Sequence, residues 1–256
     1  MSVVLNEYDW AEDAIRNQSL GKKPSETLGR VAKYYINKGA SKREARLQLE
    51  AFLKQCDPTA SIPKWSTMLD YAVSKALKYG IIEIDCVNVS KNELERINSL
   101  DGRPIKRLAF TLLCLAKYWD AVNPNGDHWV INKDTEIMKL ANINTSIRRQ
   151  SAMFAELNKL GMVQFSKKID NTSIRVCFIE EGETAMSLCD FRDLGYQYLM
   201  YMGEPYYACE SCGAIIKKNS KSTVGRKSKY CPECAAEIKI RQNVASVMRG
   251  RKNPQQ

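Results

Sequence analysis

Histidine is nearly absent from this sequence, and so are the short motifs on which many enzymes depend. The single histidine, His128, leaves almost no material for histidine-dependent nuclease, protease or catalytic-triad chemistry. The chain contains neither a glycine-rich phosphate loop of the Walker type nor a glycine fingerprint for dinucleotides. We therefore predict that the protein is not an enzyme, although a two-metal nuclease assembled from distant carboxylates stays open.

Long apolar runs are missing as well. The longest, residues 108–116, is about half the length that a membrane-spanning helix requires. The first residues, MSVVLNEYDWAED, are acidic where a secretory signal would be basic. We therefore predict a cytoplasmic protein without a membrane partner. In that reducing compartment, paired cysteines indicate a metal before a disulfide.

Positive charge is plentiful but unevenly distributed. The chain carries 39 Lys and Arg against 29 Asp and Glu residues, for a net charge of +10. Residues 209–256 hold 11 basic and only three acidic residues, so this segment alone contributes +8. Charge concentrated in one segment is typical of a phosphate-binding surface. The total excess by itself fits an ordinary basic surface equally well.

Four of the nine cysteines form two closely spaced pairs. Cys209 and Cys212 make the first pair, Cys231 and Cys234 make the second, and 18 residues separate the pairs. This spacing suits a tetrahedral site of four thiolates, because two residues between ligands let one turn direct both sulfurs at the same ion. We predict one structural Zn²⁺ ion. Two disulfides or a thiol redox motif are weaker alternatives, and four thiolates leave no open position for a catalytic zinc.

The residues around these cysteines indicate the shape of the module. Gly213 supplies the backbone freedom that a tight knuckle requires, residues 214–230 favour a β-hairpin, and residues 235–249 favour a basic helix. This arrangement over residues 206–250 resembles the treble-clef and zinc-ribbon class of small zinc fingers in bacterial and phage DNA-binding proteins. It departs from the variant with a Cys-Gly-Asn-Arg motif, because Ala-Ala-Glu follows Cys234.

Two further groups of residues are interpreted as packing elements. Three tyrosines near the ligands are expected to pack against the knuckle rather than to stack on bases: Tyr206, Tyr207 and Tyr230. The other cysteines lie in apolar contexts and are predicted to be buried hydrophobic side chains: Cys56, Cys86, Cys114, Cys177 and Cys189.

The first hundred residues show helical periodicity and helix-start motifs. Apolar residues recur at helical spacing over residues 25–38 and 63–80. Two capping boxes predict further helix starts, at Ser41 with Glu44 and at Ser90 with Glu93. We expect a small helical domain here, and nothing in its sequence names a chemistry.

Residues 105–179 follow an informative order of elements. An apolar helix over residues 105–122 is followed by a short strand at Trp129, by two helices over residues 134–141 and 145–160, and by a hairpin over residues 162–179. This order resembles that of winged helix-turn-helix domains, a family of DNA-binding domains. The resemblance implies that the second helix of the motif enters the major groove and that the hairpin, or wing, touches the backbone or the minor groove. Ile147, Phe154, Leu157 and Leu160 are predicted to form the buried side of this second helix.

The predicted nucleic-acid contacts follow from this resemblance and from the charge distribution. At the start of the second helix, the resemblance implies contacts by Ser146, Arg148, Arg149 and Gln150, and at the wing tip by Lys167 and Lys168. Phosphate contacts in the C-terminal segment are predicted for Lys217, Lys218, Lys221, Arg226, Lys227, Lys229, Arg241, Arg249 and Arg251. Many winged helices bind only protein, so a solvated helix face stays the alternative for the two arginines.

These patterns predict a mainly α protein with small β elements. The expected parts are a helical N-terminal domain (residues 1–100), a winged helix (101–182), a connecting segment (183–205) and a basic zinc module with a C-terminal helix (206–256). The favoured function is sequence-specific DNA binding, as a regulator or replication-initiation factor of a bacterium, phage or mobile element. One alternative is a phage-type inhibitor or adaptor that binds a host protein or ribonucleoprotein through the N-terminal domain. Another is an RNA-binding protein.

Overall fold

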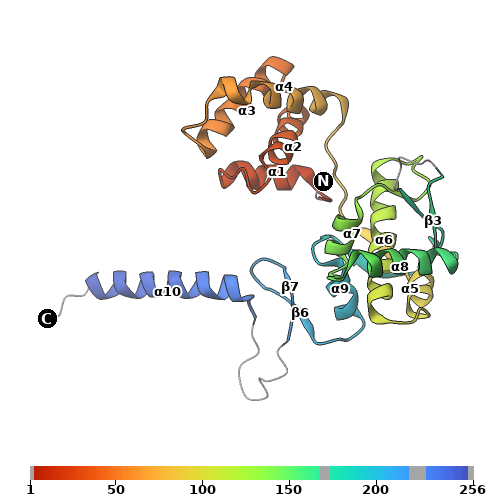
Figure 1. Cartoon of the computed structure of the whole chain (residues 1–256). Helices are drawn as coiled ribbons and strands as arrows, with labels where there is room; N and C mark the ends of the chain where they lie inside the picture. The colour runs from red at the N-terminus through yellow and green to blue at the C-terminus, as the bar shows by residue number, and fades with distance from the viewer. Residues whose placement is uncertain (1–2, 168–172, 219–228, 253–256) are drawn as a thin grey trace.

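The computed structural model describes residues 3–167, 173–218 and 229–252, without the side chains of residues 245 and 247–252. Figure 1 shows a helical bundle, a mixed unit of helices and short strands, and a C-terminal hairpin followed by a long helix. Helices predominate and the sheets are small and antiparallel, which confirms the predicted mainly α class with small β elements. Among the described residues, no helix combines the length and the apolar character needed to cross a bilayer.

The N-terminal bundle buries a hydrophobic cluster of its own. Its four helices are α1 (Glu7–Arg16), α2 (Pro24–Asn37), α3 (Lys42–Cys56) and α4 (Ile62–Lys78). Leu28, Phe52 and Leu69, from three of these helices, are almost completely shielded from solvent. The predicted capping box is present at the start of α3, where Ser41 and Glu44 each accept a hydrogen bond from the other's backbone N–H. The apolar periodicity of the helices therefore faces the interior of the bundle.

Helix α6 (Arg103–Val122) is the centre of a second hydrophobic cluster. Every residue from Leu108 to Ala116 is fully buried, as the apolar run predicts. Beside α6 lies α5 (Lys91–Asn98), which directly follows strand β1 (Val87–Ser90). The predicted capping box of Ser90 and Glu93 starts α5, and the buried Glu93 carboxylate also pairs with Lys117 of α6 at 2.8 Å.

The next elements surround α6. They are β2 (Trp129–Val130), α7 (Asp134–Leu140), α8 (Ile147–Lys159), β3 (Val163–Phe165) and β4 (Ile174–Val176). The three strands form an antiparallel sheet in the order β2-β4-β3. Helix α8 packs on α6, and its buried residues include Phe154 and Leu157, as predicted. The prediction is wrong for Ile147 and Leu160, which are 80% and 55% exposed, because they stand at the two ends of α8 and not over the core.

Residues 183–205, predicted as a connecting segment, contain two packed elements. Strand β5 (Thr184–Leu188) pairs antiparallel with β1. Helix α9 (Leu194–Tyr201) packs on α6, where the ring centroids of Tyr198 and Phe110 lie 5.2 Å apart. Both elements belong to the second hydrophobic cluster, and so do β1 and α5 from the predicted N-terminal domain. The predicted domain boundaries themselves stay a prediction, because shared packing does not test whether a segment folds alone.

The start of α9 is seated on the turn between α7 and α8. Asn142 in that turn has a left-handed φ of 54°. Its side chain accepts a hydrogen bond from Tyr196 N at 3.1 Å and donates one to Asp193 Oδ1 at 2.8 Å. A Cβ atom on Gly195 would lie 2.0 Å from the carbonyl oxygen of Ala141, so the close approach of the two backbones requires glycine. The position of α9 is therefore fixed by the turn between α7 and α8.

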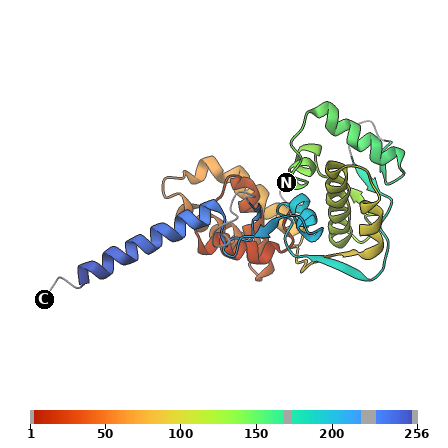
Figure 2. The same cartoon turned by 90° about the horizontal axis from the view of Figure 1, so that it is seen from below.

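The C-terminal part consists of a hairpin and a long helix. Strands β6 (Tyr206–Ala208) and β7 (Ile215–Lys217) pair with each other, and α10 (Pro232–Lys252) follows. The predicted hairpin within residues 214–230 includes residues 219–228, which lie outside the described part of the chain, so it stays a prediction; the described residues show β7 paired with β6. Both views show α10 extending away from the rest of the chain (Figures 1 and 2).

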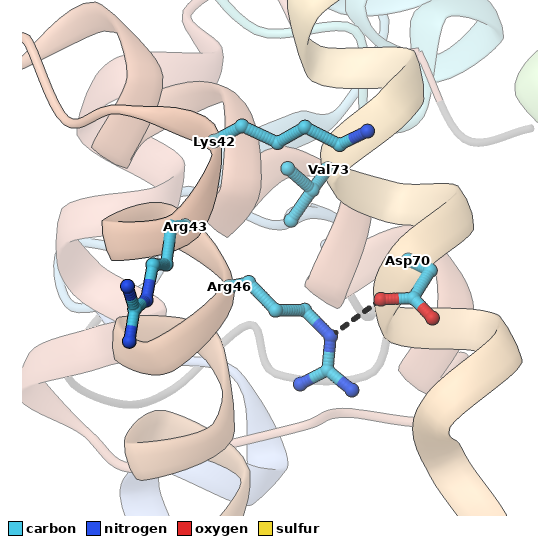
Figure 3. A pocket seen from close by; sticks show the side chains of 5 residues that line it. All are labelled: Lys42, Arg43, Arg46, Asp70 and Val73. Carbon is cyan, nitrogen blue, oxygen red and sulfur yellow. Dashed lines mark hydrogen bonds and ion pairs between the residues drawn. The ribbon is translucent and has the colours of Figure 1, made fainter.

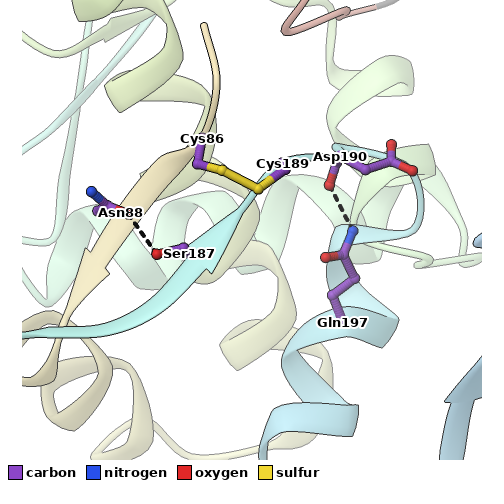
Figure 4. Close-up of a disulfide and its surroundings, with 6 residues drawn as sticks. All are labelled: Cys86, Asn88, Ser187, Cys189, Asp190 and Gln197. Carbon is purple, nitrogen blue, oxygen red and sulfur yellow. Dashed lines mark hydrogen bonds between the residues drawn. A yellow bond between two sulfur atoms is a disulfide. The ribbon is translucent and has the colours of Figure 1, made fainter.

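Cys86 and Cys189 form a disulfide (Figure 4). The antiparallel pairing of Val87 with Leu188 brings the two cysteines opposite each other, with their Cα atoms 4.2 Å apart. The prediction of buried thiols is therefore wrong for this pair. It is also wrong for Cys177, which is exposed, whereas Cys114 is buried as predicted and Cys56 is partly buried.

Candidate metal centre and basic surfaces

Four cysteine sulfurs meet between the β6–β7 hairpin and the start of α10. Cys209 directly follows β6, Cys212 lies in the hairpin turn, and Cys231 and Cys234 lie at the start of α10. Their Sγ atoms all lie within 4.8 Å of one another. The four ligands predicted from the sequence are thus close enough to hold one metal ion.

The hairpin sets the position of the first pair. Gly213 N donates a hydrogen bond to Cys209 O, and Cys209 N donates one to Ala214 O, each at 2.9 Å. Gly213 has a φ of 72°, in the left-handed region that favours glycine. A Cβ atom at this position would also approach the guanidinium of Arg192 at 3.1 Å. The predicted knuckle is present, and Gly213 makes its turn sterically accessible.

Backbone N–H groups of the second pair donate hydrogen bonds to sulfurs of both pairs. Cys231 N donates to Cys209 Sγ, and Cys234 N donates to Cys231 Sγ, each at 3.2 Å. Glu210 N donates to Lys229 O at 3.0 Å, which holds the chain before Cys231 against the hairpin. Hydrogen bonds of this kind favour the thiolate over the thiol, and the thiolate is the form that binds metals.

The spacing of the sulfurs can be compared with that of a tetrahedral centre of four thiolates. An ion bound at about 2.3 Å to each sulfur puts neighbouring sulfurs about 3.8 Å apart. The Sγ atoms of Cys212 and Cys231 are 3.8 Å apart. This one distance matches the tetrahedral value, and the remaining Sγ–Sγ distances are no longer than 4.8 Å.

The thiols of the cluster differ in their affinity for protons. Burial raises the pKa of Cys209, but the backbone N–H groups of Cys231, Cys212 and Ser211 outweigh it and lower the pKa to about 6. A hydrogen bond with Ser211 lowers the pKa of Cys234, whereas those with Cys231 and Cys212 raise it, to about 12 overall. Four thiolates in such close contact require a cation to neutralise them. The donor set thus has the chemistry of a metal site.

The predicted contact residues at the start of α8 differ in availability. Arg148 and Arg149 are exposed, and neither guanidinium pairs with a described residue. Ser146 is the exposed N-cap residue and makes no side-chain capping bond. The Gln150 amide donates to Thr145 O at 2.9 Å, so it is already engaged. The two arginines are therefore the available charged groups on this end of α8.

The predicted basic residues of the wing and the C-terminal part are only partly described. Lys167 is exposed, and so are Lys217 and Lys218 at the end of β7 and Arg241 on α10. Lys229 pairs with Glu210 at 3.1 Å, which reduces its availability for a phosphate. Four predicted residues lie outside the described part of the chain: Lys168, Lys221, Arg226 and Lys227. The side chains of Arg249 and Arg251 on α10 also lie outside it.

The tyrosines near the metal centre pack within the protein. Tyr206 is buried and stacks on Tyr196 of α9, with ring centroids 5.0 Å apart. Arg103 Nη2 donates to the Tyr206 hydroxyl at 3.2 Å, and the Tyr207 hydroxyl donates to Tyr230 O at 3.3 Å. Tyr206 thus packs as predicted, but against α9 and α6 rather than against the knuckle. The hairpin is joined in this way to the helix that is seated on the α7–α8 turn.

Sequence reasoning missed the residues that connect the part of the chain carrying the cysteine cluster with the α7–α8 turn. Asp193 and Gly195 stand 51 or more positions after Asn142, with which they form the seat of α9. The one local signal is the short gap between the helices predicted over residues 134–141 and 145–160, where an asparagine readily takes a left-handed conformation. Its partner in α9 leaves no periodic pattern in the sequence.

Comparison with known proteins returns no matching family model, no similar curated protein and no similar solved structure. Function is therefore inferred from the geometry of the described residues.

Proposed function

We propose that the protein binds duplex DNA in a sequence-specific manner. The observation that carries the proposal is the pair of exposed arginines at the start of α8, Arg148 and Arg149, whose guanidinium groups form no ion pair with a residue that the structure describes. The opposite face of α8 is anchored in the second hydrophobic cluster, so the arginines project from a fixed helix. A helix of this kind fits the major groove, where arginine binds guanine through two parallel hydrogen bonds.

The surrounding elements support an assignment to the winged helix-turn-helix class. The order α6–β2–α7–α8–β3–β4, with a sheet in the order β2-β4-β3, agrees with the arrangement expected for that class. In this proposal α8 is the recognition helix and the β3–β4 hairpin is the wing. Lys167 on the wing neutralises a backbone phosphate, which positions the helix without reading sequence.

We further infer that the cysteine cluster holds one structural zinc ion. Four sulfur ligands with no histidine or carboxylate among them favour zinc in a closed tetrahedral site. Cys209, Cys212, Cys231 and Cys234 would be its ligands, and the ion would supply a cross-link between the hairpin and α10. Zinc bound in this way contributes directly to folding, because the unfolded chain has no preformed site.

The zinc module is proposed to strengthen binding through the DNA backbone. Lys217 and Lys218 are exposed on the β7 side of the module, and Arg241 is exposed on α10. Because the hairpin is fixed to α9, and α9 to the α7–α8 turn, these cations keep a defined position relative to α8. Such contacts add affinity without sequence preference.

A salt titration of duplex binding tests the proposal. We expect the logarithm of the affinity to fall steeply with the logarithm of salt. The variant Lys217→Ala/Lys218→Ala should flatten the slope by about 2, at about 0.9 for each phosphate that is no longer neutralised. The matched control is Lys22→Ala/Lys23→Ala, which removes two exposed charges from the N-terminal bundle and should leave the slope unchanged. Absent or salt-insensitive duplex binding would refute the proposal, and a preference for RNA in competition would favour the RNA-binding alternative.

A further inference from the structure

Helix α4 carries a polar stripe on the side that faces away from the bundle core. Its buried side is formed by Leu69, Ala72, Val73 and Ala76. The opposite side, which we call the α4 stripe, consists of exposed residues at helical spacing: Lys64, Thr67, Tyr71, Ser74, Lys75 and Lys78. Tyr79, the next residue after α4, is exposed as well.

The α4 stripe carries positive charge that nearby acids do not neutralise. None of Lys64, Lys75 and Lys78 forms an ion pair with a described residue. The only carboxylate of α4 is Asp70, which instead pairs with Arg46 of α3 at 2.7 Å. The hydrogen bond from Arg46 lowers the pKa of Asp70, so this carboxylate stays ionised and committed to α3.

Two aromatic rings stand among these lysines. Tyr71 is 60% exposed and Tyr79 is 51% exposed, although burial of a tyrosine ring is energetically favourable. The ammonium group of Lys75 lies 5.0 Å from the ring centroid of Tyr71, and that of Lys78 lies 5.2 Å from the ring centroid of Tyr79. Eight residues of helix correspond to about 12 Å along the axis. The two rings are therefore separate platforms, each with an ammonium group over one of its faces.

A hollow between α3 and α4 extends the positive surface. Its volume is about 310 Å³, and its rim includes Lys42 and Arg43 of α3 next to the Arg46–Asp70 pair (Figure 3). Three basic side chains and one acidic side chain line this hollow. Lys42 and Arg43 thus add two cations at the start of α3, across the hollow from α4.

We propose that the α4 stripe, together with Lys42 and Arg43, binds single-stranded nucleic acid. The lysines would neutralise successive phosphates, and unpaired bases would stack on Tyr71 and Tyr79. Alternating cations and exposed aromatic rings are the two components by which proteins hold a single strand without reading its sequence. A duplex keeps its bases stacked on one another, so these rings offer it no comparable contact. This site is separate from α8 and does not depend on duplex recognition there.

Binding of a labelled single strand by the full-length protein tests this inference. We would measure fluorescence anisotropy with 20-nucleotide dT and rU strands and, separately, with a random duplex. Tyr71→Ala/Tyr79→Ala is expected to lower single-strand affinity by at least roughly fivefold for each ring removed, with duplex affinity unchanged. Tyr71→Phe/Tyr79→Phe keeps the rings and should retain the affinity. Lys64→Ala/Lys75→Ala/Lys78→Ala should flatten the salt dependence by about 2, at about 0.7 for each phosphate of a single strand.

The control variant separates a specific site from diffuse charge. Lys22→Ala/Lys23→Ala removes exposed lysines from the same bundle and should leave single-strand affinity unchanged. The inference is overturned if the tyrosine-to-alanine variant binds single strands as well as the natural chain does, or if the control variant loses as much affinity. Because duplex binding is measured in parallel, failure of this site and failure of the proposed duplex recognition give different results. All of these substitutions are at exposed positions, and circular dichroism checks that the helices persist.

Discussion

Replacing Glu93 with alanine should destabilise the protein far more than the same change at Glu44, although both residues belong to capping boxes. Glu93 is fully buried, and its carboxylate accepts hydrogen bonds from Ser90 N at 2.8 Å and Glu180 N at 3.1 Å. It also pairs with Lys117 Nζ at 2.8 Å. Removing one partner of a buried ion pair costs about 3–5 kcal/mol. Because the Lys117 side chain keeps 20% exposure, we expect the lower half of that range, about 3–4 kcal/mol.

The free energy of unfolding at pH 7, from guanidinium titrations followed by circular dichroism, measures the difference. Glu44 is exposed, and its hydrogen bonds with Ser41 lower its pKa. Its contribution is therefore complete at pH 7 and is lost only as the pH falls through that lowered pKa. The double variant Glu93→Ala/Lys117→Met should recover part of the loss, because no charge is left without its partner. Equal losses for Glu93→Ala and Glu44→Ala would refute the reasoning that burial determines the strength of the motif.

Three further outcomes are expected. Chelation should release one zinc ion per chain, measured with a metal-sensitive dye, and should reduce the helical signal of α10. Cys212→Ser should likewise lower the zinc content and the helical signal. An unchanged helical signal in the metal-free protein would contradict this expectation. Cys86→Ser should lower the free energy of unfolding by up to about 4.7 kcal/mol, the loop-closure value for about 100 residues, and a reductant should have no further effect on this variant. Gly195→Ala should cost about 1–3 kcal/mol because the new Cβ meets Ala141 O. In the matched helical change Gly29→Ala, the new Cβ has no neighbour within 4 Å, so the change should be neutral or stabilising by about 0.5–1 kcal/mol. Equal changes in the free energy of unfolding for the two variants would argue against the close contact of Gly195 with Ala141.

Features whose causes lie within a few residues could be predicted from the sequence. The capping boxes before α3 and α5 depend on pairs of residues three positions apart, and both are present. The cysteine pairs are equally local, since each occupies one turn, and the structure brings the two turns together. The buried run of α6 follows from its apolar composition alone.

Features that depend on distant partners could not be predicted. Strand β5 is short, and only its pairing with β1, about a hundred residues earlier, makes it a strand. The Cys86–Cys189 disulfide follows from the same pairing, so neither cysteine shows a local motif. The pairing of β7 with β6 was not predicted, because β6 lies before the first cysteine pair and the turn through Gly213 joins the two strands. Position in the helix, rather than residue type, explains the exposure of Ile147 and Leu160.

Selection of bound duplexes from a random-sequence library, followed by sequencing, tests sequence-specific recognition by α8 most directly. The natural chain should enrich one motif. Arg148→Ala/Arg149→Ala should lose the preference at the bases that these side chains contact, at about 1–3 kcal/mol for each bidentate pair. Lys217→Ala/Lys218→Ala should bind more weakly but keep the motif, because these lysines are assigned to phosphates. Enrichment of no motif by the natural chain, or of an unchanged motif by the arginine variant, would contradict the account.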